Sequence, residues 1–206
     1  KRHAYALLFT LFLMGANVYS LLKVFVIPSA VSTVSANTTS STTASSTAST
    51  STGKVTKTDT TYKDDNMDIK ITTGKTSDTT YYVADIQLSS ADYLKTALAQ
   101  NTYGTNITDT TSSIAQQNNA IFAINGDYYG ANQSGYVIKN GQVYRDTDRN
   151  SDYEDLAVYS DGSFKTFKES DTTAQKLVDS GVVNTFAFGP TLVENGKIAV
   201  SENEEV

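Results

Sequence analysis

The segment with the most chemical potential is Ala123-Ile124-Asn125-Gly126-Asp127-Tyr128-Tyr129-Gly130. Asp127 could serve as a general acid, a general base or a metal ligand. Asn125 can donate to and accept from a sugar hydroxyl, and Gly126 allows close backbone approach. Tyr128 and Tyr129 offer ring faces with polar tips. The same residues also suit an ordinary turn with aromatic packing beneath it, and the pattern alone leaves both interpretations open.

A second candidate is the pair Arg145 and Arg149, the only arginines besides Arg2. A guanidinium group presents a planar fork that fits phosphate or carboxylate. Asp146, Asp148 and nearby acids could equally pair with these arginines in a solvated loop. A third candidate is Gly189-Pro190, which follows an apolar segment as Asn125-Gly126 does, and which alone reads as a turn.

Composition excludes several classes of chemistry. The 206 residues contain no Cys and only one His, His3, so thiolate nucleophiles, catalytic triads and His- or Cys-based metal sites have no ligands here. The formal net charge is −6, which disfavours nucleic acid as a partner. Carboxylate, amide, hydroxyl, Lys and Arg groups remain; no cofactor is expected, and use of a divalent metal stays open.

The elements expected to position these residues are strands joined by tight turns. Asn140-Gly141, Asp161-Gly162 and Asn195-Gly196 each separate two short apolar stretches, which predicts three β-hairpins. Alternating residues predict strands over 67–71 and 81–88, and the apolar run 120–124 predicts a strand buried on both faces. Short helices are expected over 89–99, 110–118 and 172–180. The fold class is therefore α+β, with mixed or antiparallel sheets built from hairpins and a few short helices.

The N-terminal residues suggest export. Lys1, Arg2 and His3 precede an uncharged stretch over 4–22, which predicts a single-pass signal-anchor or transmembrane segment within 1–36 and a cell-membrane location with the domain extracytoplasmic. Cleavage near Ala36 and secretion is the alternative. From Asn37 to Gly53, 13 of 17 residues are Ser or Thr, so 37–60 is expected to be a disordered linker. Residues 61–206 would then form one domain.

Three segments, taken in order, resemble signatures of the phosphodiester glycosidase family, whose members include uncovering-enzyme-like domains and bacterial exopolysaccharide biosynthesis-type proteins. The segments are 120–130, then Gly135-Tyr136-Val137-Ile138-Lys139-Asn140-Gly141, then 188–196. The family's later Arg-Thr-Ala-like and Asp-Gly-Gly-Gly-Ser-like segments are not found, so we expect the C-terminal part of the domain to be missing from this chain.

The resemblance implies an extracytoplasmic hydrolase that cleaves a sugar-1-phosphodiester in exopolysaccharide or cell-wall glycan metabolism. On this hypothesis Asp127 and Asn125 are catalytic. Gly126, Tyr128, Tyr129, Arg145, Arg149, Gly189 and Pro190 bind the carbohydrate or its phosphate. The alternative is a non-catalytic glycan-binding module at the cell surface, which would use the same groups without turnover.

Overall fold

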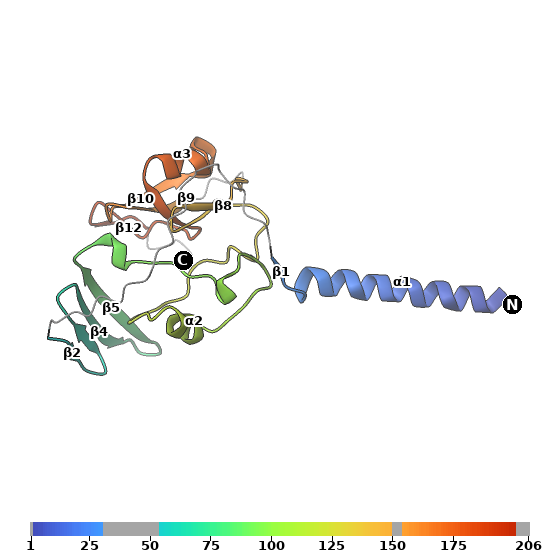
Figure 1. Ribbon diagram of the computed structural model, residues 1–206, viewed down its shortest axis with the longest axis horizontal. Helices are drawn as coiled ribbons and strands as arrows, with labels where there is room; N and C mark the ends of the chain where they lie inside the picture. The colour runs from blue at the N-terminus through green and yellow to red at the C-terminus, as the bar shows by residue number, and fades with distance from the viewer. Residues whose placement is uncertain (1, 31–53, 150–153, 201–206) are drawn as a thin grey trace. The chain divides into compact units, whose positions relative to one another are not determined.

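The computed structural model describes residues 2–30, 54–149 and 154–200, and they form an α+β fold with antiparallel strand pairs, a few short helices and one N-terminal helix of 24 residues (Figure 1). The predicted fold class is confirmed in this respect. The predicted cleavage site near Ala36 and the Ser/Thr-rich stretch 37–53 lie outside the described residues. Strand β2, Thr56–Lys57, falls within the range predicted as linker.

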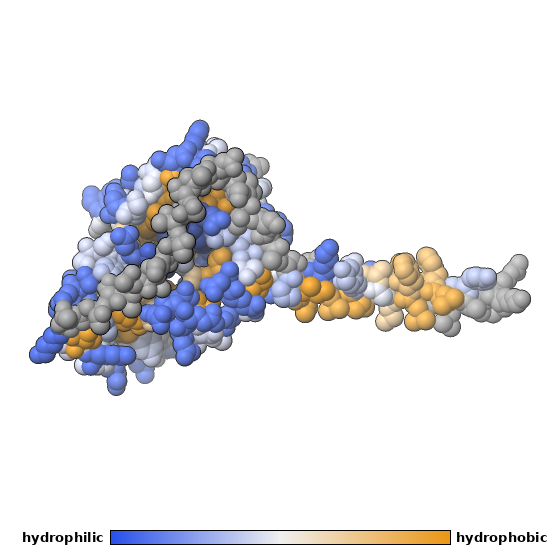
Figure 2. Space-filling view, viewed as in Figure 1, coloured by the Kyte–Doolittle hydropathy of each residue, from blue (hydrophilic) through white to orange (hydrophobic). Residues whose placement is uncertain are grey.

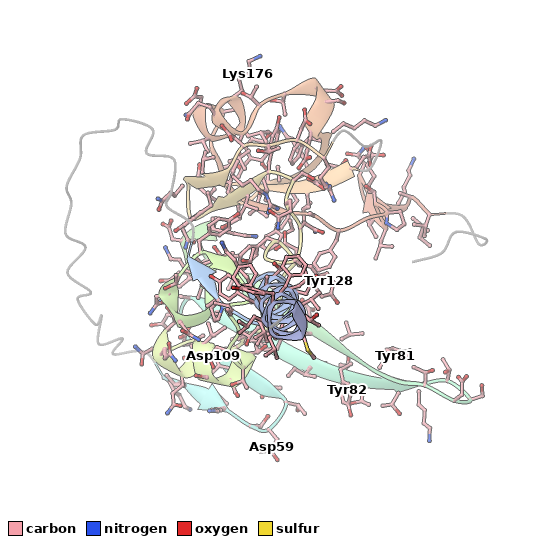
Figure 3. The ribbon with its side chains drawn as sticks, turned by 90° about the vertical axis from the view of Figure 1, so that its right-hand side faces the viewer. Asp59, Tyr81, Tyr82, Asp109, Tyr128 and Lys176 are labelled. Atoms are coloured by element: carbon pink, nitrogen blue, oxygen red, sulfur yellow. The ribbon has the colours of Figure 1, made fainter. Side chains whose placement is uncertain are left out.

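The chain divides into two compact units. One comprises residues 37–95 and 159–163, and its described part contains a four-stranded antiparallel sheet in the order β2-β3-β4-β5. Strands β3, β4 and β5 are Thr61–Lys63, Met67–Lys75 and Thr80–Leu88. Two of them confirm the strands predicted over 67–71 and 81–88. Only Ile69 is a buried apolar residue of this sheet, and Tyr82 on β5 is 72% exposed (Figure 3).

The helix predicted over 89–99 is wrong. A 3-10 turn forms instead at Ala91–Tyr93, and the Ser90 side chain caps it by accepting from the Asp92 amide. A second 3-10 turn, Ala99–Asn101, contains Gln100 at φ 54°, a backbone conformation that interrupts a helix. Short polar side chains here bond to the nearby backbone and favour turns over a continuing helix.

The other unit comprises 1–36, 96–158 and 164–206, and its helix α1 runs from Arg2 to Phe25. The described side chains of α1 include exposed apolar groups such as Leu8, Phe12 and Met14, which colour it orange in Figure 2. Among the described residues, no helix combines the length and apolar character required to cross a bilayer. The transmembrane segment predicted within 1–36 is therefore not supported.

Three hairpins form where the turn dipeptides predict them. Strand β7, Val137–Lys139, pairs with β8, Gln142–Arg145, across Asn140-Gly141, whose φ angles are 51° and 79°. Positive φ at both central residues matches the twist of the strands, which explains the Asn-Gly preference. Strands β9, Glu154–Tyr159, and β10, Phe164–Lys168, form the second hairpin, and β12, Val193–Glu194, with β13, Lys197–Ile198, forms the third.

Two helices confirm the positions predicted over 110–118 and 172–180. Helix α2, Thr111–Gln117, begins after Thr110, whose hydroxyl accepts from the Ser113 amide at 3.1 Å. Helix α3, Ala174–Asp179, begins after Thr173 and ends before Gly181 at φ 100°. Helix α3 contacts β7, β8 and β11. Strand β11, Val182–Phe186, is a neighbour of β9. Apolar residues from these elements make the core: Val137, Ile138, Ala157, Val158, Ala174, Leu177 and Val182.

Residues 120–124 differ from the prediction. They form no strand, and Ile121 and Ile124 are exposed, Ile124 by 78%. The apolar run has the composition of a buried strand, but none of the described strands pairs with it. A β-strand requires a neighbouring strand to hydrogen-bond with, and an apolar run alone does not specify such a neighbour.

Two short strands complete this unit. Strand β1, Ser29–Ala30, pairs with β6, Gly104–Thr105, in antiparallel register.

Next to β7, the Thr185 hydroxyl of β11 accepts from the Ile138 amide at 3.0 Å and donates to the Tyr136 carbonyl at 3.1 Å. These bonds hold β7 beside β11, the pair of strands on which the candidate site is built.

Candidate functional site

The Asn125-Gly126-Asp127 segment, called here the corner, lies beside the end of β11. Asn125 is exposed and in no regular element. A Cβ added to Gly126 would lie 3.6 Å from Cε1 of Phe186, the last residue of β11, so the backbone of the corner runs close against that ring. The corner and the strand end are thus packed together.

Asp127 is buried and fully engaged by protein groups. Its side chain is 2% exposed. The Oδ1 atom lies 3.3 Å from the ammonium of Lys139, and Oδ2 accepts a hydrogen bond from the Ala187 amide at 2.9 Å. A carboxylate held in this way links the corner to the residue just past β11.

Lys139, the last residue of β7, is the cation of the corner. Its side chain is 5% exposed, and its Nζ also donates to the Thr185 carbonyl at 2.7 Å. The ammonium lies 4.1 Å from the centroid of the Phe186 ring and 5.9 Å from that of Tyr129. Burial lowers the pKa of Lys139, and the neighbouring Asp127 charge opposes that shift.

The two tyrosines after the corner have different surroundings. Tyr129 stacks on Tyr103 with ring centroids 5.4 Å apart, and Tyr103 also contacts Tyr144 at 5.0 Å. Burial raises the pKa values of Tyr103 and Tyr129. Arg145 opposes the rise at Tyr103 and the Asp127 charge adds to both rises, so these phenols stay neutral at ordinary pH. Tyr128 instead is 72% exposed and meets Phe188 edge-on at 6.3 Å (Figure 3). Tyr128 and Phe188 thus offer accessible rings, whereas Tyr129 packs in an aromatic cluster.

Arg145 organises the loop that follows the corner. Its Nε donates to the Gly135 carbonyl at 2.6 Å, and its Nη1 donates to the carbonyls of Tyr129 at 3.0 Å and Asn132 at 2.5 Å. Three backbone acceptors along 129–135 therefore converge on one guanidinium, a use for which the planar fork of Arg is suited.

Arg149 belongs to a separate buried acidic group. Its guanidinium forms ion pairs with Asp155 and, at 3.7 Å from Nε, with Glu169. Glu169 also accepts from the amides of Arg149 at 2.6 Å and Tyr136 at 2.5 Å. Burial raises the pKa of Asp155 to about 7, helped by the Glu169 carboxylate, which accepts a hydrogen bond from protonated Asp155, and against the lowering effect of Arg149. Both arginines thus have protein partners, and the phosphate-binding role expected for them stays a prediction.

The Gly189-Pro190 segment follows Phe188 and contains a cis peptide bond. Pro190 lines a shallow hollow with Thr191, Ala199 and two acids, Glu154 and Glu194. The Thr191 hydroxyl donates to Glu154 at 2.8 Å. The structure therefore brings the corner, Tyr128 and the segment leading to Gly189 together, because Asp127 binds Ala187 and Tyr128 contacts Phe188.

Sequence reasoning missed three contributors to this site: Lys139, the Ala187 amide and the Phe188 ring. The sequence did contain a signal for Lys139, which directly follows the apolar residues Val137 and Ile138. A cation at a buried strand position requires an anionic partner. In the part of the chain that the structure describes, no three carboxylate or imidazole side chains gather where they could hold a metal ion.

Comparisons with known proteins find similarity in this region. A family model described as phosphodiester glycosidase matches residues 118–206, which include the corner, both arginines and Gly189-Pro190. The chain is 31% identical over 99 residues to the SPbeta prophage-derived uncharacterized protein YomE of Bacillus subtilis (strain 168). That alignment covers 46% of this chain and 15% of the relative, so the chain spans a small part of the relative's length. No solved structure matches the chain. The resemblance found in the three motifs is confirmed: residues 118–206 match the phosphodiester glycosidase family.

Proposed function

We propose that the chain belongs to an enzyme that hydrolyses sugar-1-phosphodiesters. Water adds to the anomeric carbon, the bond from that carbon to the phosphate oxygen breaks, and the products are free sugar and a phosphomonoester. The family match over residues 118–206 supports the reaction class. The observation that carries the site is the fixed corner, where buried Asp127 is bound to Ala187.

The proposed substrate surface consists of solvent-exposed residues in and beside the corner. Asn125 is exposed and its amide can bind sugar hydroxyls, and the Gly126 backbone is also exposed. The rings of Tyr128 and Phe188 are 72% and 51% exposed and meet edge-on, which leaves ring faces for a sugar. These four residues lie within two short stretches that Asp127 joins.

The burial of Asp127 favours a different role from the acid or base expected first. Both of its oxygens are engaged by protein groups, so we assign it to positioning the corner. The leaving group is a phosphomonoester, which departs more readily than an alkoxide, so the reaction depends less on a strong general acid than ordinary glycoside cleavage does. Asn125 then orients the sugar.

A second candidate function is glycan binding without turnover. The same engagement of Asp127 favours it, because a binding module needs exposed rings and amides but no reactive carboxylate. This candidate predicts saturable binding of the sugar and no release of phosphomonoester.

We propose an extracytoplasmic setting for this activity, in exopolysaccharide or cell-wall glycan metabolism. The support is the N-terminal order of Lys1 and Arg2 followed by the uncharged stretch over 4–22, the arrangement of an export signal. Fusion of residues 1–60 to a reporter active only outside the cytoplasm tests this setting.

The activity is tested with the purified full chain and an N-acetylglucosamine-1-phosphodiester, by measuring free sugar and phosphomonoester. We expect both products in equal amounts, and their loss in Asn125→Ala. Gln142→Ala is the control, since it removes another exposed amide, on β8. Saturable binding without products would support the binding module instead. If the chain neither bound the sugar nor released products, both functions would be excluded.

A further inference from the structure

We propose that Lys139 is a positioning residue for hydrolysis at the corner: through its buried ion pair with Asp127 it holds the substrate-contacting residues in place. The inference rests on the proposed function, which it deepens by adding a residue with no assigned role. Lys139 itself is 95% removed from solvent, so it acts through other groups and does not touch substrate.

The first step of the argument is the cost of burying this pair. The side chains of Lys139 and Asp127 are 5% and 2% exposed. Removing two charges from water is unfavourable unless each gains close partners with good geometry. Loss of either partner would leave the other charge buried and unpaired, so each side chain holds the other at this position.

What the pair fixes is the junction of three segments. Lys139 ends β7, Asp127 lies in the corner, and the remaining partners lie at the end of β11. The Lys139 ammonium donates to the Thr185 carbonyl at 2.7 Å, while Asp127 accepts from the Ala187 amide at 2.9 Å. The two charged groups therefore bind the β11 end on both sides of Phe186.

Phe186 occupies the space between these bonds. Its ring centroid lies 4.1 Å from the Lys139 ammonium, a cation–π distance. The same ring lies against Gly126, where an added Cβ would be 3.6 Å away. The ring thus fills the position between the lysine and the corner backbone.

The residues anchored by the ion pair are close in sequence to the proposed substrate-contacting residues, so the pair also positions the substrate surface. Asn125 and Tyr128 flank Asp127 closely, and Phe188 directly follows Ala187. The residues that contact substrate in our proposal are therefore one or two positions from the residues that the pair anchors. A displacement of about 1 Å at such groups can cost about 10²-fold in rate.

The experiment compares Lys139→Met, Lys139→Arg and the surface control Lys176→Met in the full chain. Lys176 is exposed on α3 (Figure 3). We expect Lys139→Met to lower kcat about 10²-fold with KM changed less than about threefold, because misplacement affects the transition state most. Lys139→Arg should retain at least a tenth of the wild-type kcat, and the control Lys176→Met should have the wild-type kcat.

The pH profile gives a readout that simple destabilisation would not change. Because Lys139 can lose its proton and an arginine cannot, kcat of the wild type should decline at high pH while that of Lys139→Arg stays level. A folded Lys139→Met with wild-type kcat overturns the proposal, as does an identical high-pH decline in Lys139→Arg.

Two further measurements separate failure of this inference from other failures. If Lys139→Met does not fold, the double variant Lys139→Met with Asp127→Asn removes both buried charges; it should fold with low kcat, and wild-type kcat would overturn the proposal. If the wild type hydrolyses no sugar-1-phosphodiester, the proposed function fails by itself. Hydrogen exchange of the Ala187 amide then decides: faster exchange in Lys139→Met than in Lys176→Met supports the positioning role, and equal protection overturns it.

Discussion

The Asp127 carboxylate accepts a hydrogen bond from the Ala187 amide at 2.9 Å, across 60 residues of chain. This bond joins two segments that the sequence presents as independent turns, Asn125-Gly126 and Gly189-Pro190. The proximity of Tyr128 to Phe188 follows from it, since each ring is one residue away from the bonded pair.

Asp127→Asn should lower both stability and turnover. Asn keeps an acceptor for the Ala187 amide but leaves the buried Lys139 without an anion. Breaking one partner of a buried ion pair costs about 3–5 kcal/mol in the free energy of unfolding. Urea unfolding and phosphodiester turnover measure the two effects. Asp59→Asn, an exposed site in the other unit, is the control (Figure 3); equal stability of both variants would show that the pair contributes nothing.

Tyr128→Ala should weaken carbohydrate binding and leave stability almost unchanged. An exposed ring contributes little to folding, typically within about 0.5 kcal/mol, whereas loss of a ring–sugar contact should lower affinity by roughly tenfold, which corresponds to about 1.4 kcal/mol. Tyr82→Ala is a matched control, because both side chains are 72% exposed. Equal affinity of the two variants for the sugar probe would remove Tyr128 from the binding surface.

Arg145→Lys should destabilise the loop after the corner. A lysine ammonium cannot reproduce the geometry of the fork that reaches the carbonyls of Gly135, Tyr129 and Asn132. Carbonyls left without donors cost about 1–3 kcal/mol, measured as a lower urea midpoint. Lys176→Arg, an exposed cation exchange, should leave the midpoint unchanged. A midpoint equal to that of the wild type in Arg145→Lys would contradict the loop-organising role.

Asp155 should make the domain less stable as the pH rises from about 4 to 7. Its pKa is raised from 3.8 to about 7 in the folded chain, so between these values the folded state binds more protons than the unfolded state. The unfolding free energy therefore falls with rising pH, by at most about 1.4 kcal/mol per pH unit, and levels off above pH 7. Asp155→Asn should flatten this slope in urea titrations at several pH values. A slope as steep as that of the wild type would contradict the assignment.

The local parts of the fold were predictable from sequence, and the long-range parts were not. The Asn140-Gly141 turn demands positive φ at both residues, so the hairpin follows from the dipeptide alone. The Lys139–Asp127 pair depends on how β7 meets the corner, which no local rule specifies. The run 120–124 failed as a strand for the same reason, since its apolar side chains say nothing about which strand pairs with it.

In the candidate site, too, the local motifs were predictable from the sequence and the long-range contacts were not. The three motifs indicated the family, and the family match confirmed it for residues 118–206. The partners of Arg145 and Arg149 could not be foreseen, because carbonyls of a folded loop and the buried Glu169 meet them only in three dimensions. Residue type therefore indicated the candidate segments but not the partners of each side chain.

The most direct test of the central claim is hydrolysis of an N-acetylglucosamine-1-phosphodiester by the full chain in water enriched in oxygen-18. Glycosidic cleavage predicts that the label enters the free sugar at its anomeric hydroxyl and that the phosphomonoester carries none. Label in the phosphate would show cleavage at phosphorus, and an absence of turnover would show no hydrolysis at all; either result would contradict the account.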